Sequence, residues 1–217
     1  MKLRTLLTTS SLFAVLVMPM AAQALDVNIT ADLPQVEVMH GDQKIVIMRN
    51  QNKGNTIKPD FAITSRHCPP YCIQPSALAP GVETIAELEV LRYLKKVSDG
   101  DKNILVIDSR TPDWVAKGTI PGSINIPWTQ LNIGSSNPFT VQDLLETHLG
   151  VKNVEGFYMF DHAKTLVMFC NGAWCGQSPT NIRGLLKIGY PADKIKWYRG
   201  GMQDWEMLGL TTVKSAK

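Results

Sequence analysis

The chain has 217 residues, of which 44% are hydrophobic, and a formal net charge of +3. The charge falls to +1 once the two basic residues of the leader described below are removed, which argues against nucleic acid as a partner. The remaining length can hold one full domain with a sizeable core and an appendage.

Residues 1–24 have the features of a secretory signal peptide. Lys2 and Arg4 form a basic start, and the apolar stretch from Leu6 to Met18 is too short to span a bilayer comfortably. Ala22-Gln23-Ala24 then supplies a small-x-small cleavage site. We therefore expect export to a bacterial periplasm and a mature chain that is free of the membrane. An uncleaved anchor is the alternative.

Residues 25–81 are predicted to form an N-terminal extension. Val36-Glu37-Val38 and Lys44–Met48 are typical of strands, and they flank a turn at His40-Gly41-Asp42. From Gln51 to Gly81 the chain is rich in Pro, Asn and Ser, so we expect an ordered but irregular connector.

The connector contains the sequence Cys68-Pro69-Pro70-Tyr71-Cys72. The proline pair stiffens this segment, and an oxidising compartment favours a local disulfide between Cys68 and Cys72. A second redox or sulfur-relay pair is the alternative. His67 lies beside Cys68, but a zinc site would lack a clear fourth ligand, so we expect no metal and no cofactor.

From Val82 onward, strands alternate with helices. Thr84-Ile85-Ala86-Glu87 predicts a capping-box start to a helix. The apolar residues expected on one face of that helix are Ile85, Leu88, Leu91 and Leu94. Further strands are predicted at Ile104–Ile107, Ser123–Ile126, Leu166–Phe169 and Ile195–Tyr198, and further helices at Val141–Leu149 and after Ser178. This alternation predicts an α/β fold with a parallel sheet covered on both faces.

Cys170 ends one of these strands and is followed by a short loop and by a helix opening at Ser178-Pro179. Backbone N–H groups and the positive end of the helix favour an anion there, so the thiol is expected to ionise. Because the thiolate is the nucleophilic form, Cys170 is the candidate catalytic residue. The alternative is an apolar residue that closes the strand. The substrate-binding loop is predicted to comprise Asn171, Gly172, Ala173, Trp174, Gly176, Gln177 and Ser178.

Cys175 lies in the same loop and is the second candidate catalytic residue. It could resolve a persulfide or sulfenate on Cys170 by forming an intraloop disulfide. A static structural disulfide between the same two residues is the alternative, and the sequence leaves both open. Trp174 either shields the sulfur from water or packs against its neighbours.

Three segments of the chain resemble, in the right order, the signatures of the rhodanese superfamily. Ile107–Trp114, continuing through Gly118–Pro127, is similar to the N-terminal signature of the family. Cys170–Ser178 is similar to its active-site loop, and Tyr198–Trp205 to its C-terminal signature. The resemblance implies a rhodanese-like domain over residues 82–217.

This resemblance implies an enzyme that carries a persulfide. Cys170 would take sulfane sulfur from a small donor and pass it to a thiol acceptor or to cyanide, while the loop N–H groups stabilise the charged sulfur. Asp108 and Arg110 are implied to pair and to order the strand ends below the loop, with a direct contact to the substrate as the alternative. A periplasmic protein is a further expected partner.

The chain also departs from the family pattern. Counted to the residue before Ser178, its loop is longer than the loops usual for the sulfurtransferases and for their phosphatase relatives. Gly176 stands where a phosphatase needs arginine, which argues against phosphate-ester chemistry. The loop contains no Arg or Lys, so thiosulfate is expected to be a poor donor, and Arg183 is expected on a solvated helix face. Thr119 replaces the usual histidine, which we interpret as a structural change.

The sequence thus favours a periplasmic sulfurtransferase, with two competing hypotheses. One is a thiol–disulfide oxidoreductase that uses Cys170 and Cys175 as its exchanging pair. The other is an inactive rhodanese-fold module that binds a partner through the N-terminal extension.

Overall fold

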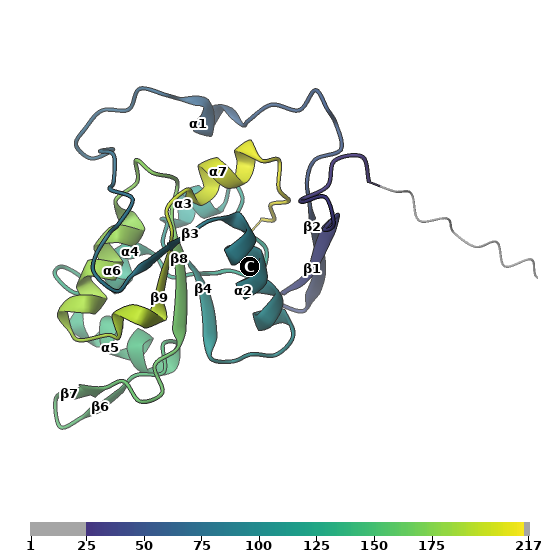
Figure 1. The fold of residues 1–217 in the computed structure, drawn as a ribbon. Coiled ribbons are helices and arrows are strands. Elements are labelled where there is room, and N and C mark those ends of the chain that lie inside the picture. Colours follow the sequence, from purple (N-terminus) through teal and green to yellow (C-terminus); the bar gives the residue numbers. More distant parts are fainter. Residues whose placement is uncertain (1–24, 215–217) are drawn as a thin grey trace, which may run out of the picture.

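The computed structural model describes residues 25–214, so the predicted signal peptide lies outside the described residues. A five-stranded parallel sheet forms the centre of the molecule (Figure 1). In spatial order its strands are β3 (Glu83–Ile85), β9 (Ile195–Tyr198), β8 (Thr165–Phe169), β4 (Ile104–Asp108) and β5 (Ile124–Asn125). The predicted α/β fold with a parallel sheet is confirmed.

The two faces of the sheet bury separate apolar cores, because successive residues of a strand point to opposite faces. On one face, side chains such as Ile107 and Met168 pack in a core with residues of three helices. These are α4 (Trp128–Leu131), α5 (Pro138–Thr147) and α6 (Gln177–Lys187), which lie together on one side of the sheet in Figure 1.

The opposite face is covered by helices and by the N-terminal hairpin. Here Val106 and Val167 of the sheet share a core with residues of α2 (Glu87–Ser98) and α7 (Gly201–Met207). The hairpin consists of the antiparallel strands β1 (Gln35–His40) and β2 (Gln43–Met48), which confirms the prediction. Its residues Val38 and Ile47 are buried in the same core.

The predicted start of the first domain helix is wrong. Glu83–Ile85 forms the edge strand β3, which pairs with β9, so the helix begins only at Glu87. The backbone N–H of Ala86 donates to the side chain of Glu89 at 3.1 Å, in place of the predicted capping box at Thr84–Glu87. An edge strand needs a partner from the far end of the chain, which a local pattern does not reveal.

The apolar face of α2 shifts accordingly. Ile85 belongs to β3, and Leu88 is exposed instead of buried. The buried residues of the helix are Val90, Leu91 and Leu94.

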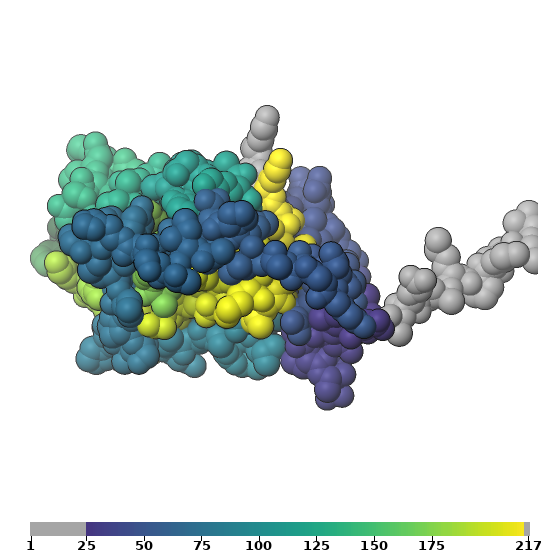
Figure 2. Space-filling view, turned by 90° about the horizontal axis from the view of Figure 1, so that it is seen from above, coloured from purple at the N-terminus to yellow at the C-terminus, as the bar shows by residue number. Residues whose placement is uncertain are grey.

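The connector, residues 51–81, has α1 (Pro59–Ala62) as its one regular element, as expected for an irregular segment. It passes over the end of the molecule where α3 (Pro112–Val115) and α7 lie, and Figure 2 shows it in blue across that face. This is the end at which the segments following β4 and β9 emerge.

Several further elements were not predicted, among them the short helices α1, α3, α4 and α7. A small hairpin of β6 (Lys152–Val154) and β7 (Phe157–Met159) lies at the opposite end of the sheet in Figure 1, and a short 3-10 helix spans Ala192–Lys194. Within residues 25–214, no helix has the length and apolar character needed to cross a membrane.

Candidate active site

Cys170 follows directly after β8, at the carboxyl end of the sheet. Helix α6 begins at Gln177, one residue before the predicted Ser178, so the loop runs from Cys170 to Gly176 and is one residue shorter than the sequence count. Cys170 is only 2% exposed, so its sulfur lies inside the protein. The strand, cysteine, loop and helix therefore follow one another as the sequence predicts.

Hydrogen bonds to the Cys170 sulfur favour its ionised form. Burial raises the pKa of this thiol, but hydrogen bonds from the Cys175 side chain, from the Ser178 side chain and from backbone N–H groups lower it to about 7. The backbone donors belong to Gly172 and Ser178, at the two ends of the loop. Near neutral pH a large share of Cys170 is therefore thiolate.

The hydroxyl of Ser178 is a side-chain donor to the Cys170 sulfur, and two hydrogen bonds fix its position. Its Oγ donates to the Cys170 sulfur at 3.2 Å, and it accepts a hydrogen bond from Trp197 Nε1, also at 3.2 Å. Both Ser178 and Trp197 are almost completely buried. Because the indole N–H is a donor only, it orients the hydroxyl proton toward the sulfur.

The start of α7 fixes the backbone of the loop from the other side. The backbone N–H of Met202 donates to the Cys170 carbonyl at 3.0 Å, and that of Gln203 donates to the Asn171 carbonyl at 2.9 Å. Gly201 makes this approach feasible, because its φ is +55° and a Cβ there would clash with the carbonyl oxygen of Cys170. The C-terminal signature thus positions the reactive loop.

Asp108 and Arg110 form a buried ion pair beside the site. Arg110 Nε donates to Asp108 Oδ1 at 2.9 Å and Nη2 to Oδ2 at 2.6 Å, and both side chains are 1% exposed. Arg110 also donates to the carbonyl of Gly118, and Thr119 Oγ1 donates to Asp108 at 2.7 Å. The two residues pair as the resemblance implied, and Thr119 is a structural member of their network.

The rhodanese-like domain family matches residues 91–208, which is more than half of the chain. The chain belongs to this family. The matched segment falls within residues 82–217, where the sequence predicts the domain, and it gives the protein a fold of the sulfurtransferase type. The division of the chain into leader, extension and domain stays a prediction.

Several solved structures are similar to this rhodanese-like protein. A thiosulfate sulfurtransferase from Pseudomonas aeruginosa shares 18% identity over 63% of this chain and 21% of its own, with a TM-score of 0.42. A human single-domain sulfurtransferase shares 21% identity over 57% of this chain and 95% of its own (TM-score 0.37). A Bacillus halodurans protein shares 17% identity over 57% and 70% (TM-score 0.39). This chain spans about a fifth of the Pseudomonas enzyme, and no curated protein matches it.

Cys175 lies in the rhodanese loop as a second buried thiol. It is 4% exposed, and the structure describes both it and Cys170 as free cysteines. Burial and the neighbouring Cys170 sulfur raise the pKa of Cys175 well above its usual value. The loop therefore combines one readily ionised sulfur with one that stays protonated and donates a hydrogen bond.

The connector is held against the reactive loop. The backbone N–H of Gln74 donates to the Ala173 carbonyl at 2.8 Å. Tyr71 meets the ring of Trp174 edge-on with centroids 5.6 Å apart, and the Arg66 guanidinium lies 3.7 Å from the centre of that ring. The side chain of Trp174 in the loop therefore packs against the connector.

A cavity of about 310 Å³ lies between the connector and the loop. Cys175 lines this cavity, whereas Cys170 does not. The other residues that line it are Pro70, Tyr71, Trp114, Trp128, Asn171, Gly176, Gln177 and Thr180. None of these nine side chains is acidic, basic or a histidine.

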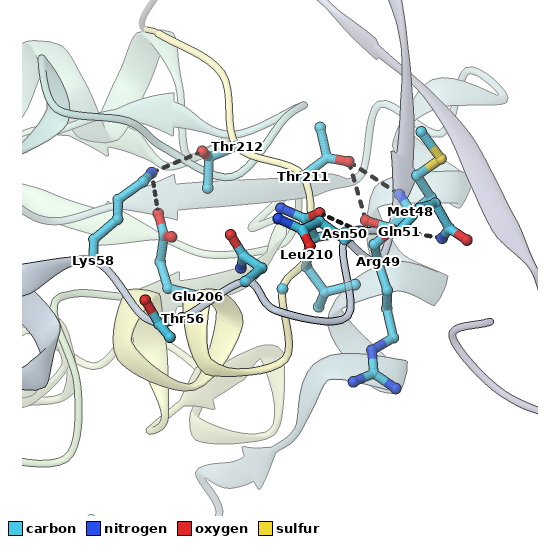
Figure 3. A pocket seen from close by; sticks show the side chains of 13 residues that line it. Met48, Arg49, Asn50, Gln51, Thr56, Lys58, Glu206, Leu210, Thr211 and Thr212 are labelled. Carbon is cyan, nitrogen blue, oxygen red and sulfur yellow. Dashed lines mark hydrogen bonds and ion pairs between the residues drawn. The ribbon is translucent and has the colours of Figure 1, made fainter. Parts of the chain in front are cut away.

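A second cavity, of about 450 Å³, lies between the start of the connector and the end of the chain. Figure 3 shows its polar side chains directed largely toward one another, with Lys58 bound to Glu206 and Thr212, and Thr211 bound to Met48. No cysteine or histidine is among the described residues that line it. No residue of the Cys170–Gly176 loop lines it, so this cavity is separate from the reactive loop.

Other candidates from the sequence lie away from the reactive sulfur. His67 and Arg183 are exposed, and for Arg183 this is the expected position on a solvated helix face. Across residues 25–214, no three His, Cys, Asp or Glu side chains cluster in a way that could hold a metal ion.

Sequence reasoning missed the aromatic residues around the loop. Trp128 directly follows the N-terminal signature, Trp197 lies on β9, and Tyr71 lies between Cys68 and Cys72. One signal was available, because Trp114 and Trp128 both follow strands whose carboxyl ends meet at this edge of the sheet.

Alkylation should report the lowered pKa of Cys170. We expect iodoacetamide to modify the reduced protein at Cys170 with a midpoint near pH 7, and Cys175 only at much higher pH. Peptide mass analysis after timed alkylation at each pH measures both profiles, with free cysteine as the reference. A Cys170 midpoint at or above that of free cysteine would contradict the role given to the hydrogen bonds.

Proposed function

We propose that this rhodanese-like protein is a periplasmic sulfurtransferase that carries sulfane sulfur as a persulfide on Cys170. The observation that carries the proposal is a buried cysteine directly after β8, at the carboxyl end of the sheet, whose sulfur accepts a hydrogen bond from the Ser178 hydroxyl. The lowering of its pKa to about 7 by hydrogen bonds supports the same proposal. Family membership supports the same reading. The acceptor is a thiol.

The transfer divides into two exchanges at sulfur. The Cys170 thiolate attacks the outer sulfur of a persulfide or polysulfide donor, forming Cys170–S–SH as the donor leaves as a thiolate. The acceptor thiolate then attacks the same sulfur, forming the acceptor persulfide and restoring the Cys170 thiolate. The hydrogen-bond donors around the Cys170 sulfur stabilise the negative charge on that sulfur in both exchanges.

The second candidate function is thiol–disulfide exchange by Cys170 and Cys175. The observation that favours it is the presence of two buried free thiols in one loop, of which Cys170 has a lowered pKa and Cys175 a raised pKa. The third alternative, an inactive binding module, requires an unreactive Cys170.

Mass analysis of the protein recovered from the periplasm separates these functions. After reduction and exposure to polysulfide, the sulfurtransferase hypothesis expects a gain of one sulfur atom on the Cys170 peptide, removable by cyanide. A Cys170–Cys175 bridge that cycles with a periplasmic reductant would favour the oxidoreductase instead. An unmodified Cys170 would favour the third hypothesis, an inactive binding module.

Thiosulfate should be a poor sulfur donor. Its sulfonate end needs a cationic partner, and the side chains lining the cavity at the loop include neither Lys nor Arg. Because a hydrogen bond to a charged group contributes about 1.5–3 kcal/mol, loading should be at least about tenfold slower than with a polysulfide. Equal single-turnover rates with the two donors would contradict this.

Cys68 and Cys72 should be oxidised to each other in protein recovered from the periplasm. Their sulfurs lie within disulfide bonding distance, and the segment between them contains Tyr71, which contacts Trp174 of the loop. Non-reducing peptide mapping should show one fragment that links them. Free thiols at both positions, or links to Cys170 or Cys175, would contradict a local clip.

A further inference from the structure

Trp197 is a buried residue of the central sheet that lies one position before the segment resembling the C-terminal signature. On β9 it is paired with Met168 of β8, which lies two residues before Cys170. Both Trp197 and Met168 pack in the core that α6 covers. The indole therefore meets the first turn of α6, where its Nε1 donates to Ser178 Oγ at 3.2 Å.

This hydrogen bond determines what the Ser178 hydroxyl does. A serine hydroxyl carries one proton and can accept hydrogen bonds, and its proton rotates to suit its partners. Since the indole N–H is already directed at the oxygen, the hydroxyl proton must point elsewhere. Among the hydrogen bonds of residues 25–214, its one acceptor is the Cys170 sulfur at 3.2 Å. The hydrogen bond on the sulfur is thus supported from β9.

One titratable group among the described residues, Cys175, also acts on the Cys170 sulfur, and its own thiol stays protonated. On the neighbouring strand β4, Asp108 is bound to Arg110. The charged and titratable side chains of α6, α7 and β9 are exposed or interact elsewhere: Arg183, Lys187, Lys196 (with Glu83), Tyr198 (with Glu87), Asp204 (near Arg199) and Glu206 (with Lys58). A change at Trp197 therefore acts on the sulfur through Ser178 and not through a charge.

We propose that Trp197 is a positioning residue for sulfur transfer, which acts through the Ser178 hydroxyl to hold a hydrogen bond on the Cys170 sulfur. This assignment rests on the proposed function of Cys170 as a persulfide carrier. The hydrogen bond serves both exchanges. In the first it favours the thiolate that attacks the donor. In the second it stabilises the Cys170 sulfur as that sulfur leaves with the electron pair of the breaking S–S bond, because a thiol of lower pKa is the better leaving group.

Removing the indole N–H without changing the shape of the ring tests this role. Site-specific replacement of Trp197 with 3-benzothienylalanine puts a sulfur atom in place of the N–H. The midpoint of Cys170 alkylation by iodoacetamide should then rise by about one pH unit. The limiting rate at high pH should not fall, because a thiolate of higher pKa is the stronger nucleophile. Trp197→Phe should shift the midpoint in the same direction.

Two further variants show whether the effect passes through Ser178. Ser178→Ala should raise the midpoint at least as much, and adding the change at Trp197 should raise it no further. The matched control is Tyr190→Phe, which removes a buried hydroxyl donor to the Lys164 carbonyl in the same core and should leave the midpoint unchanged. An unshifted midpoint in the 3-benzothienylalanine protein, additive shifts, or an equal shift in Tyr190→Phe would overturn the proposal.

Sulfur transfer is measured separately, so that this inference and the proposed function can fail independently. After loading with polysulfide, delivery to 2-mercaptoethanol at high pH should be slower in the 3-benzothienylalanine protein than in the native protein, because Cys170 is the poorer leaving group. A shifted midpoint in a protein that never gains sulfur would support the role of Trp197 and overturn the sulfurtransferase. Sulfur loading with an unshifted midpoint would overturn the positioning role alone.

Discussion

Replacing Cys170 with serine should abolish sulfur transfer with every donor. A serine hydroxyl stays protonated near neutral pH and cannot form a persulfide, whereas the thiol of Cys170 has a pKa of about 7. Single-turnover loading by polysulfide, read by intact mass, should show no sulfur gain. Persistent loading at another residue would place the chemistry elsewhere.

Substitutions at Cys175 provide the comparison. Cys175→Ser keeps a hydrogen-bond donor and should still load Cys170 in a single turnover, while recovery from oxidation is impaired. Cys175→Ala removes the donor, so the pKa of Cys170 should rise. Its loading at pH 7 should then slow by about threefold to tenfold, and its alkylation profile should move to higher pH.

One result would reverse the assignment of roles. If Cys175→Ser is as inactive as Cys170→Ser in a single turnover, the carrier mechanism is wrong. The two cysteines would then act as a dithiol, and the oxidoreductase hypothesis would replace it.

Replacing Arg110 with alanine should cost about 3–5 kcal/mol of the free energy of unfolding, because it leaves the buried Asp108 carboxylate without its partner. Urea unfolding at a fixed redox potential measures the loss. The matched control is Arg92→Ala, which removes an exposed pair with Glu89 and should cost no more than about 1 kcal/mol.

A loss of this size could leave Arg110→Ala unfolded, since a domain is stable by only about 5–15 kcal/mol. The double variant Asp108→Leu with Arg110→Met removes both charges and should regain part of the lost stability, because the Gly118 carbonyl still loses its Arg110 donor and the Thr119 hydroxyl its Asp108 acceptor. Equal losses for Arg110→Ala and Arg92→Ala, or no recovery in the double variant, would show that the pair does not stabilise the fold.

The sequence predicts strands best where burial on both faces of the sheet requires a continuous run of apolar residues. Ile104–Asp108 and Thr165–Phe169 are central strands covered on both faces, so their identity and the reactive position after the second one were predictable. The small hairpin containing Phe157 was missed because its apolar residues are exposed and follow no burial pattern.

The cavity could not be predicted for a different reason. Its walls come from segments that are far apart in the sequence, such as Tyr71 in the connector and Trp128 in α4. Nothing in either local pattern says that the two meet. The identity of the nucleophile follows from one segment, whereas the shape of the space in front of it depends on the complete fold.

The N-terminal hairpin shares its core with the domain, and this affects how the protein can be divided. Val38 and Ile47 are buried beside Leu91 and Leu94 of α2. A fragment beginning at residue 82 would expose Leu91 and Leu94 of α2 to water, because the hairpin that covers them would be absent. Truncation is therefore a test of folding before it is a test of activity, because the extension contributes side chains to the core of the domain.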